Sequence, residues 1–109
     1  MVWLHDLSYL AGGAALANGV PHFVSGVMGR PFQSPFARPP GEGLSSSTVN
    51  VAWGFFNFVV GYLLIARVGS FDIRASDQAG AAGLGLLAMG LLTARLFGRF
   101  HGGNAPTDG

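Results

Sequence analysis

Two polar side chains lie one helical turn apart inside an otherwise apolar stretch. They are Asn18 and His22, in the segment ANGVPHFVSGVMG at residues 17–29. Asparagine offers hydrogen-bond donors and acceptors, and histidine can titrate near neutral pH or ligate haem. Residues four apart share one helix face, so we expect both side chains to point the same way. Pro21, between them, is expected to kink the helix because proline removes a backbone donor.

A second apolar stretch carries Asn50 and Asn57 on one of its faces. Asn57 lies near the middle of residues 49–66, as Asn18 does in residues 7–29. Polar side chains inside a membrane usually face the bundle and pair with one another. We therefore expect Asn18, His22 and Asn57 to lie at similar depth and to face each other. The candidate intramembrane polar cluster consists of Asn18, Pro21, His22, Asn50 and Asn57.

Three long apolar stretches must position these residues: 7–29, 49–66 and 79–98. A helix that crosses a bilayer needs about 20 mostly apolar residues. Of the 109 residues, 50% are hydrophobic and only 10% are charged, whereas a soluble domain has about 25% charged residues. The sequence predicts an all-α fold, an integral membrane bundle of three transmembrane helices forming a single domain over 1–109. It has a proline-rich loop at 30–48 and a flexible tail at 101–109.

Glycine is abundant, at 18 residues, and in membrane helices glycine permits close approach of two backbones. In the second stretch, glycines share a face with the asparagines, within an arc of roughly 60°. The first and third stretches carry small-residue faces of their own. Six glycines are the expected helix-packing positions: Gly26, Gly29, Gly54, Gly61, Gly83 and Gly90.

The connecting segments carry capping signals. Residues 45–48 (SSST) offer several N-cap side chains for the second helix, and Ser76 or Asp77 could cap the third. In the 30–48 loop, the proline density resists both helix and strand. We expect this loop to be a stiff connector.

Arginine distribution predicts the orientation of the three helices. Four arginines fall on the side of the 30–48 loop and two on the other side: Arg30, Arg38, Arg95 and Arg99, against Arg67 and Arg74. The side richer in positive charge is usually cytoplasmic, which places the N-terminus outside. The opening residues MVWLHD lack the positive charge of a signal peptide, so we expect the first stretch to be a retained span.

Several function classes are disfavoured. With 0 cysteines, the chain has no disulfide, thiolate metal site or cysteine nucleophile. A formal net charge of +1 gives no basic surface for nucleic acid. None of the three stretches holds a carboxylate that could orient His22 for catalysis or couple protons to export. We expect no enzyme activity, no bound metal and no cofactor.

The segments NGVPHFVSGVMG, RPFQSPFARPPGEGLSSS and NVAWGFFNFVVG carry a resemblance. Over residues 18–61 the chain resembles a family of uncharacterised small bacterial integral membrane proteins, with NGxPHF in the first span and NVxWGxxN in the second. The resemblance implies a membrane fold and a bacterial inner-membrane location. It implies no chemistry, and no residue roles follow from it.

The leading functional expectation is a structural or assembly subunit, in which the polar cluster joins the helices by hydrogen bonds. Its partners would be the lipid bilayer and either further copies of itself or a larger membrane complex. One alternative is an oligomeric transporter or channel for a small solute or protons that uses His22. Another is haem or quinone binding in a dimer, because only one histidine lies within a span.

Overall fold

Three helices make up most of the chain in the computed structural model, which describes residues 2–103. These are α1 (Val2–Val27), α2 (Ser47–Ala66) and α3 (Ser76–His101). The prediction of a mostly helical chain with three helices is confirmed. Most of the tail expected at 101–109 lies outside the described residues, and His101 itself ends α3.

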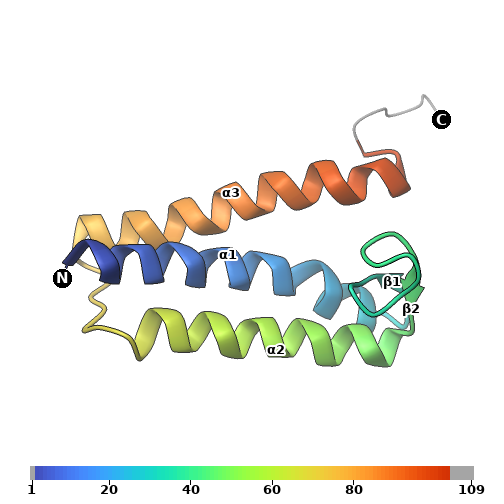
Figure 1. Ribbon diagram of the computed structural model, residues 1–109, viewed down its shortest axis with the longest axis horizontal. Helices are drawn as coiled ribbons and strands as arrows, with labels where there is room; N and C mark the ends of the chain where they lie inside the picture. The colour runs from blue at the N-terminus through green and yellow to red at the C-terminus, as the bar shows by residue number, and fades with distance from the viewer. Residues whose placement is uncertain (1, 104–109) are drawn as a thin grey trace.

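The three helices form a layer in which α1 is central (Figure 1). α2 runs antiparallel to α1 on one side, and α3 packs on the other side, while contacts between α2 and α3 are few. Every helix–helix interface of substance therefore involves α1. The helices begin and end within a few residues of the predicted spans, and α1 continues unbroken through Pro21.

A repeat of small residues sets the contact between α1 and α2. A small residue recurs at every seventh position on both helices: Gly12, Gly19 and Gly26 on α1, and Ser47, Gly54 and Gly61 on α2. A Cβ added to Gly19 would lie 2.8 Å from the Gly54 carbonyl oxygen, and one added to Gly54 would lie 2.8 Å from that of Gly19. A seven-residue repeat is typical of helices that cross at about 20°. The two backbones thus meet in a single register.

The contact between α1 and α3 uses different glycines. A side chain at Gly13 would collide with the main chain of Ala82, and one at Gly85 would collide with the main chain of Leu10. Gly85 is the only buried residue of α3. This interface therefore depends on two close backbone approaches near the start of α3.

The expected packing glycines fall into two groups. Gly26, Gly54 and Gly61 lie against the neighbouring helix. Gly83 and Gly90, by contrast, face open space, because α3 contacts α1 through the face that carries Gly85 instead. Gly29 likewise has no neighbour within 4 Å of an added Cβ, and it follows the end of α1 with a φ of 76°.

The end of α1 explains the position of Gly29. The Gly29 N–H donates to the Gly26 carbonyl and the Arg30 N–H donates to the Ser25 carbonyl, both at 2.9 Å. This is the Schellman arrangement, which favours glycine at the left-handed position. Gly29 therefore terminates α1 and turns the chain into the loop.

The 30–48 loop is more ordered than its prolines suggest. Strands β1 (Phe32–Gln33) and β2 (Leu44–Ser45) pair antiparallel within it, so the expectation that it resists strand formation was wrong. Ser46 then caps α2, its hydroxyl accepting from the Val49 N–H at 3.2 Å. The N-cap of α3 is Ala75, without a side-chain hydrogen bond, rather than Ser76 or Asp77.

Two of the three helices, α2 and α3, are long and apolar enough to cross a membrane. α1 is long enough at 26 residues, but it does not reach the same mean hydropathy. Its interior carries the polar side chains of Asn18, His22 and Ser25. Whether α1 crosses a membrane therefore depends on how these groups are satisfied.

Substitution of a single glycine tests the register between α1 and α2. We expect Gly54→Ala to destabilise the protein by about 1–3 kcal/mol, because the new methyl group has no room and overpacking has a cost of this size. Gly83→Ala is the matched control, since nothing lies within 4 Å of its added Cβ. Thermal unfolding in mild detergent would compare the two variants. Equal melting temperatures would contradict the close contact at Gly54.

Candidate functional site

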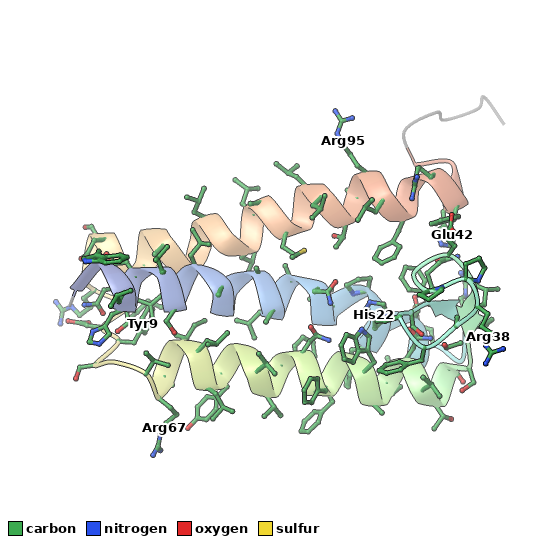
Figure 2. All side chains as sticks on the ribbon, viewed as in Figure 1. Tyr9, His22, Arg38, Glu42, Arg67 and Arg95 are labelled. Atoms are coloured by element: carbon green, nitrogen blue, oxygen red, sulfur yellow. The ribbon has the colours of Figure 1, made fainter. Side chains whose placement is uncertain are left out.

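The polar cluster centres on a buried hydrogen bond between His22 of α1 and Asn50 of α2. His22 Nδ1 lies 2.8 Å from Asn50 Oδ1, and the two residues are 2% and 0% exposed. Figure 2 shows His22 lying toward the end of the molecule that carries the hairpin. The site therefore joins the two helices near the loop, well away from the N-terminus.

Asn50 also holds the hairpin in place. Its Nδ2 donates to three carbonyl oxygens, those of Phe32, Ser45 and Ser46, at 3.1–3.2 Å. Phe32 belongs to β1 and Ser45 to β2, so one amide group contacts both strands and the start of α2. A single side chain thus connects α1, α2 and the hairpin.

These contacts determine that the Nδ1 atom of His22 carries a hydrogen. Turning the Asn50 amide over would place its oxygen against three carbonyl oxygens, so Nδ2 must face the carbonyls and Oδ1 must face His22. Because Oδ1 can only accept, His22 Nδ1 must donate. In the neutral imidazole the other nitrogen, Nε2, then carries the lone pair and can accept a hydrogen bond.

A second polar pair lies deeper along the same interface. Asn18 Nδ2 donates to Asn57 Oδ1 at 3.1 Å, and Asn57 Nδ2 donates to the Trp53 carbonyl at 2.9 Å. Asn18 thus meets Asn57, while His22 meets Asn50. Pro21 does not join this network, and it lines a separate groove with Val24.

The two pairs lie at different depths, contrary to the single depth expected from the sequence. Asn18 and Asn57 share a depth because they are hydrogen-bonded to each other, and His22 lies four residues further along α1, a rise of about 6 Å at about 1.5 Å per residue. Because α1 spans Val2–Val27 rather than the predicted 7–29, His22 is also nearer to the end of its helix than expected. His22 therefore belongs to the loop end of the bundle.

Aromatic side chains surround His22. The rings of Phe32, Trp53 and Phe97 meet the imidazole edge-on, at centroid distances of 5.5, 6.4 and 5.7 Å. This enclosure could not be predicted from the sequence, because Phe97 comes from α3 and Phe32 from the hairpin. Only the tertiary fold brings these segments to His22.

The hairpin contributes further polar contacts that sequence reasoning missed. Gln33 and Ser34 are buried, and the Ser34 hydroxyl hydrogen bonds with that of Ser45. Gln33 Oε1 lies 3.0 Å from His101 Nε2 at the end of α3. The contact between Gln33 and His101 connects α3 to the hairpin. A Gln–Ser pair inside a proline-rich loop does not by itself indicate such contacts, so the sequence could not predict them.

A cleft of about 550 Å³ opens beside His22. Its walls come from α1, α2, the loop and the last turns of α3. Asn18, His22 and Trp53 lie on the helical side of the cleft, and the exposed residues Glu42 and Arg99 also line it. The cleft thus combines polar atoms from the buried network with apolar and aromatic walls.

A carboxyl pair lies at the opposite end of the bundle, where α1 and α3 begin. Burial raises the pKa of the Asp6 carboxyl above its ordinary value of 3.8, Asp77 raises it further through a hydrogen bond and repulsion, and His5 lowers it. Within residues 2–103, Asp6 Oδ1 is buried without a hydrogen-bond partner. This contact between helices thus raises the pKa of the Asp6 carboxyl.

No family model, curated protein or solved structure matches this chain. The resemblance drawn from residues 18–61 therefore stays a prediction, and the geometry of the chain itself is the basis for its function.

Removal of the Asn50 amide should release the hairpin. In Asn50→Ala, the His22 Nδ1–H and the carbonyls of the hairpin lose their partner, and each buried group left unsatisfied costs about 1–3 kcal/mol. We expect chymotrypsin to cleave the Phe32–Gln33 bond faster in this variant, because Phe32 is buried in the intact hairpin. Val49→Ala, at an exposed neighbouring position, should leave the rate unchanged. Unchanged cleavage in Asn50→Ala would show that Asn50 does not hold the hairpin.

The carboxyl pair predicts a pH dependence. The raised pKa of Asp6 means that the folded state holds the proton more tightly than the unfolded chain, so stability falls as the pH rises from about 3.8 through the raised pKa. Asp6→Asn should flatten this part of the pH profile and raise the melting temperature at neutral pH. Asp72→Asn, in the exposed loop before α3, removes the same charge and should do neither. Parallel profiles for the unsubstituted protein and Asp6→Asn would refute the prediction.

Proposed function

We propose that all three helices cross a lipid bilayer and that the protein acts as a structural or assembly subunit of a membrane. The observation that carries this proposal is that polar side chains are buried while large apolar side chains are exposed, the reverse of the distribution in a soluble protein. The buried polar residues are His22, Gln33, Ser34, Asn50 and Asn57, whereas the buried hydrophobic ones are only Tyr9, Ala17, Phe32 and Ala37, within the described part of the chain.

The outer surface supports the same proposal. Large apolar side chains are exposed on every helix, among them Val27 on α1 at 59%, Phe55 on α2 at 60% and Leu91 on α3 at 61%. A soluble monomer rarely exposes an apolar patch larger than a few hundred Å². Only 22% of the apolar window of α2 and 11% of that of α3 is buried, which argues against both being core helices of a soluble protein. Lipid tails are the solvent that suits this surface.

α1 joins the bilayer in this proposal because three of its polar side chains have internal partners. Asn18 pairs with Asn57, His22 with Asn50, and the Ser8 hydroxyl donates to the Leu64 carbonyl at 2.6 Å. At about 1.5 Å per residue, the helix is about 39 Å long, more than the ~30 Å of hydrocarbon it would cross. Satisfied polar groups of this kind are tolerated inside membrane bundles.

The structural role follows from how the polar groups are used. The pairs Asn18–Asn57 and His22–Asn50 both link α1 to α2, and Asn50 also holds the hairpin. Among the residues that line the cleft beside His22, the only carboxylate is that of Glu42, which is exposed and comes from the loop rather than from a helix. These features support assembly rather than transport. The open faces at Gly83 and Gly90 on α3 suit contact with further copies of the chain or with a larger complex.

The proposed orientation follows the arginines. Arg38 lies in the loop at one end of the molecule and Arg67 at the opposite end (Figure 2). The loop end also receives Arg30, Arg95 and Arg99, so the more positive end is the proposed cytoplasmic side of a bacterial inner membrane. The N-terminus then lies outside.

Single cysteines can test this topology, because the chain contains 0 cysteines of its own. We would place Ser70→Cys in the loop between α2 and α3 and Glu42→Cys in the 30–48 loop, both at exposed positions. A membrane-impermeant maleimide applied to intact cells should label only the cysteine at position 70. Labelling of position 42 alone would reverse the orientation. Release of the protein from membranes by alkaline carbonate would overturn membrane insertion itself.

A further inference from the structure

The cleft beside His22 contains a polar atom that the bundle does not use. His22 Nδ1 donates to Asn50, the main chain of Gln33 approaches the ring, and within residues 2–103 no side chain is hydrogen-bonded to His22 Nε2. In that part of the chain, the fully buried side-chain atoms without a partner are Asp6 Oδ1 and Trp53 Nε1. Nε2 is therefore the nitrogen of His22 that keeps access to the cleft, which His22 lines.

We propose that this cleft binds an apolar aromatic molecule that carries a hydroxyl group, and that the hydroxyl donates its hydrogen bond to His22 Nε2. The proposal goes beyond the structural role proposed above, because the cleft is formed within one copy of the chain. It concerns binding only and involves no chemical step.

The polar atoms of the cleft select a neutral donor. The Asn50 contact makes Nε2 an acceptor, and Asn18 uses Nδ2 to donate to Asn57, which leaves its Oδ1 as a second acceptor. A carboxylate placed against these two atoms would meet two lone pairs. A hydroxyl group presents the hydrogen that both acceptors lack.

The walls select an aromatic body. Trp53, Phe97 and Phe100 line the cleft, together with Leu96 and two prolines. Aromatic rings pack edge-to-face with favourable energy beyond their buried area. A volume of about 550 Å³ falls in the range of about 300–1,000 Å³ that is common for small-molecule sites.

The position of the cleft suits an amphipathic ligand. It lies at the loop end of the bundle, and the charged residues Glu42 and Arg99 both line it and are exposed. Under the proposed topology this end meets the bilayer interface. Molecules with an apolar body and one polar group concentrate at that depth, as tryptophan and tyrosine side chains do.

The test compares two probes of nearly identical shape, 4-butylphenol and 4-butylanisole, in which a methyl ether replaces the hydroxyl. We would label the histidines of the full chain with ¹⁵N and record their ring signals in detergent micelles, using His22→Asn to assign His22. We expect 4-butylphenol to shift the Nε2 signal of His22, while 4-butylanisole leaves it in place. Equal shifts, or no shift with either probe, would overturn the proposal.

A variant supplies an independent measurement. In His22→Asn the new amide can still donate to Asn50, but it has no atom in the place of Nε2. With Trp3→Phe as background, Trp53 is the sole tryptophan, and its fluorescence reports binding in the cleft. We expect 4-butylphenol to bind about three- to tenfold more weakly to His22→Asn, the change that loss of one hydrogen bond gives. The affinity for 4-butylanisole should not change. Equal losses for both probes would mean that the variant has altered the cleft as a whole and would count against the hydroxyl contact.

Discussion

The loop end of this protein depends on the side chain of Asn50. One amide group accepts from His22 of α1 and donates to carbonyls of both hairpin strands and of the residue that caps α2. Each interhelical hydrogen bond in a membrane bundle contributes only about 0.6 kcal/mol on average. Asn50 contributes more to stability than one such bond, because several buried groups would lose their partner together if its side chain were removed. A residue with 0% exposure thus controls the position of a loop that sequence alone presents as a simple connector.

The glycine register and the polar pairs support each other because α1 and α2 are antiparallel. Placing Gly19 opposite Gly54 brings Asn18 to Asn57 and leaves His22 within reach of Asn50. A slip by one residue would separate both polar pairs and would also place side chains where the backbones now touch. Local and long-range preferences therefore agree on one arrangement, which is the property expected of a sequence with a unique fold.

The sequence predicted the helices, the cap region before α2 and the face on which its asparagines lie. Helical periodicity is sufficient for these features because it determines which residues share a face. It does not determine which face meets a partner, so Gly83 and Gly90 were assigned to packing although α3 uses Gly85. His22 was expected near the middle of the first helix because the polar residues His5 and Asp6 suggested that the helix begins at Leu7. The helix begins at Val2 and ends at Val27, so His22 lies nearer to its end. The aromatic enclosure could not be predicted, since Phe32 and Phe97 reach His22 only through the fold.

The cleft itself is a consequence of how side-chain size varies along α3. Near its start, Gly85 lets the backbone touch α1, whereas towards its end Phe97 stands between α3 and His22. Figure 1 accordingly shows α3 diverging from α1 towards the loop. The contact of His101 with Gln33 and the stacking of its ring on Phe32 then hold the end of α3 at that separation. Small residues at one end and large ones at the other thus turn a helix contact into an open space beside His22.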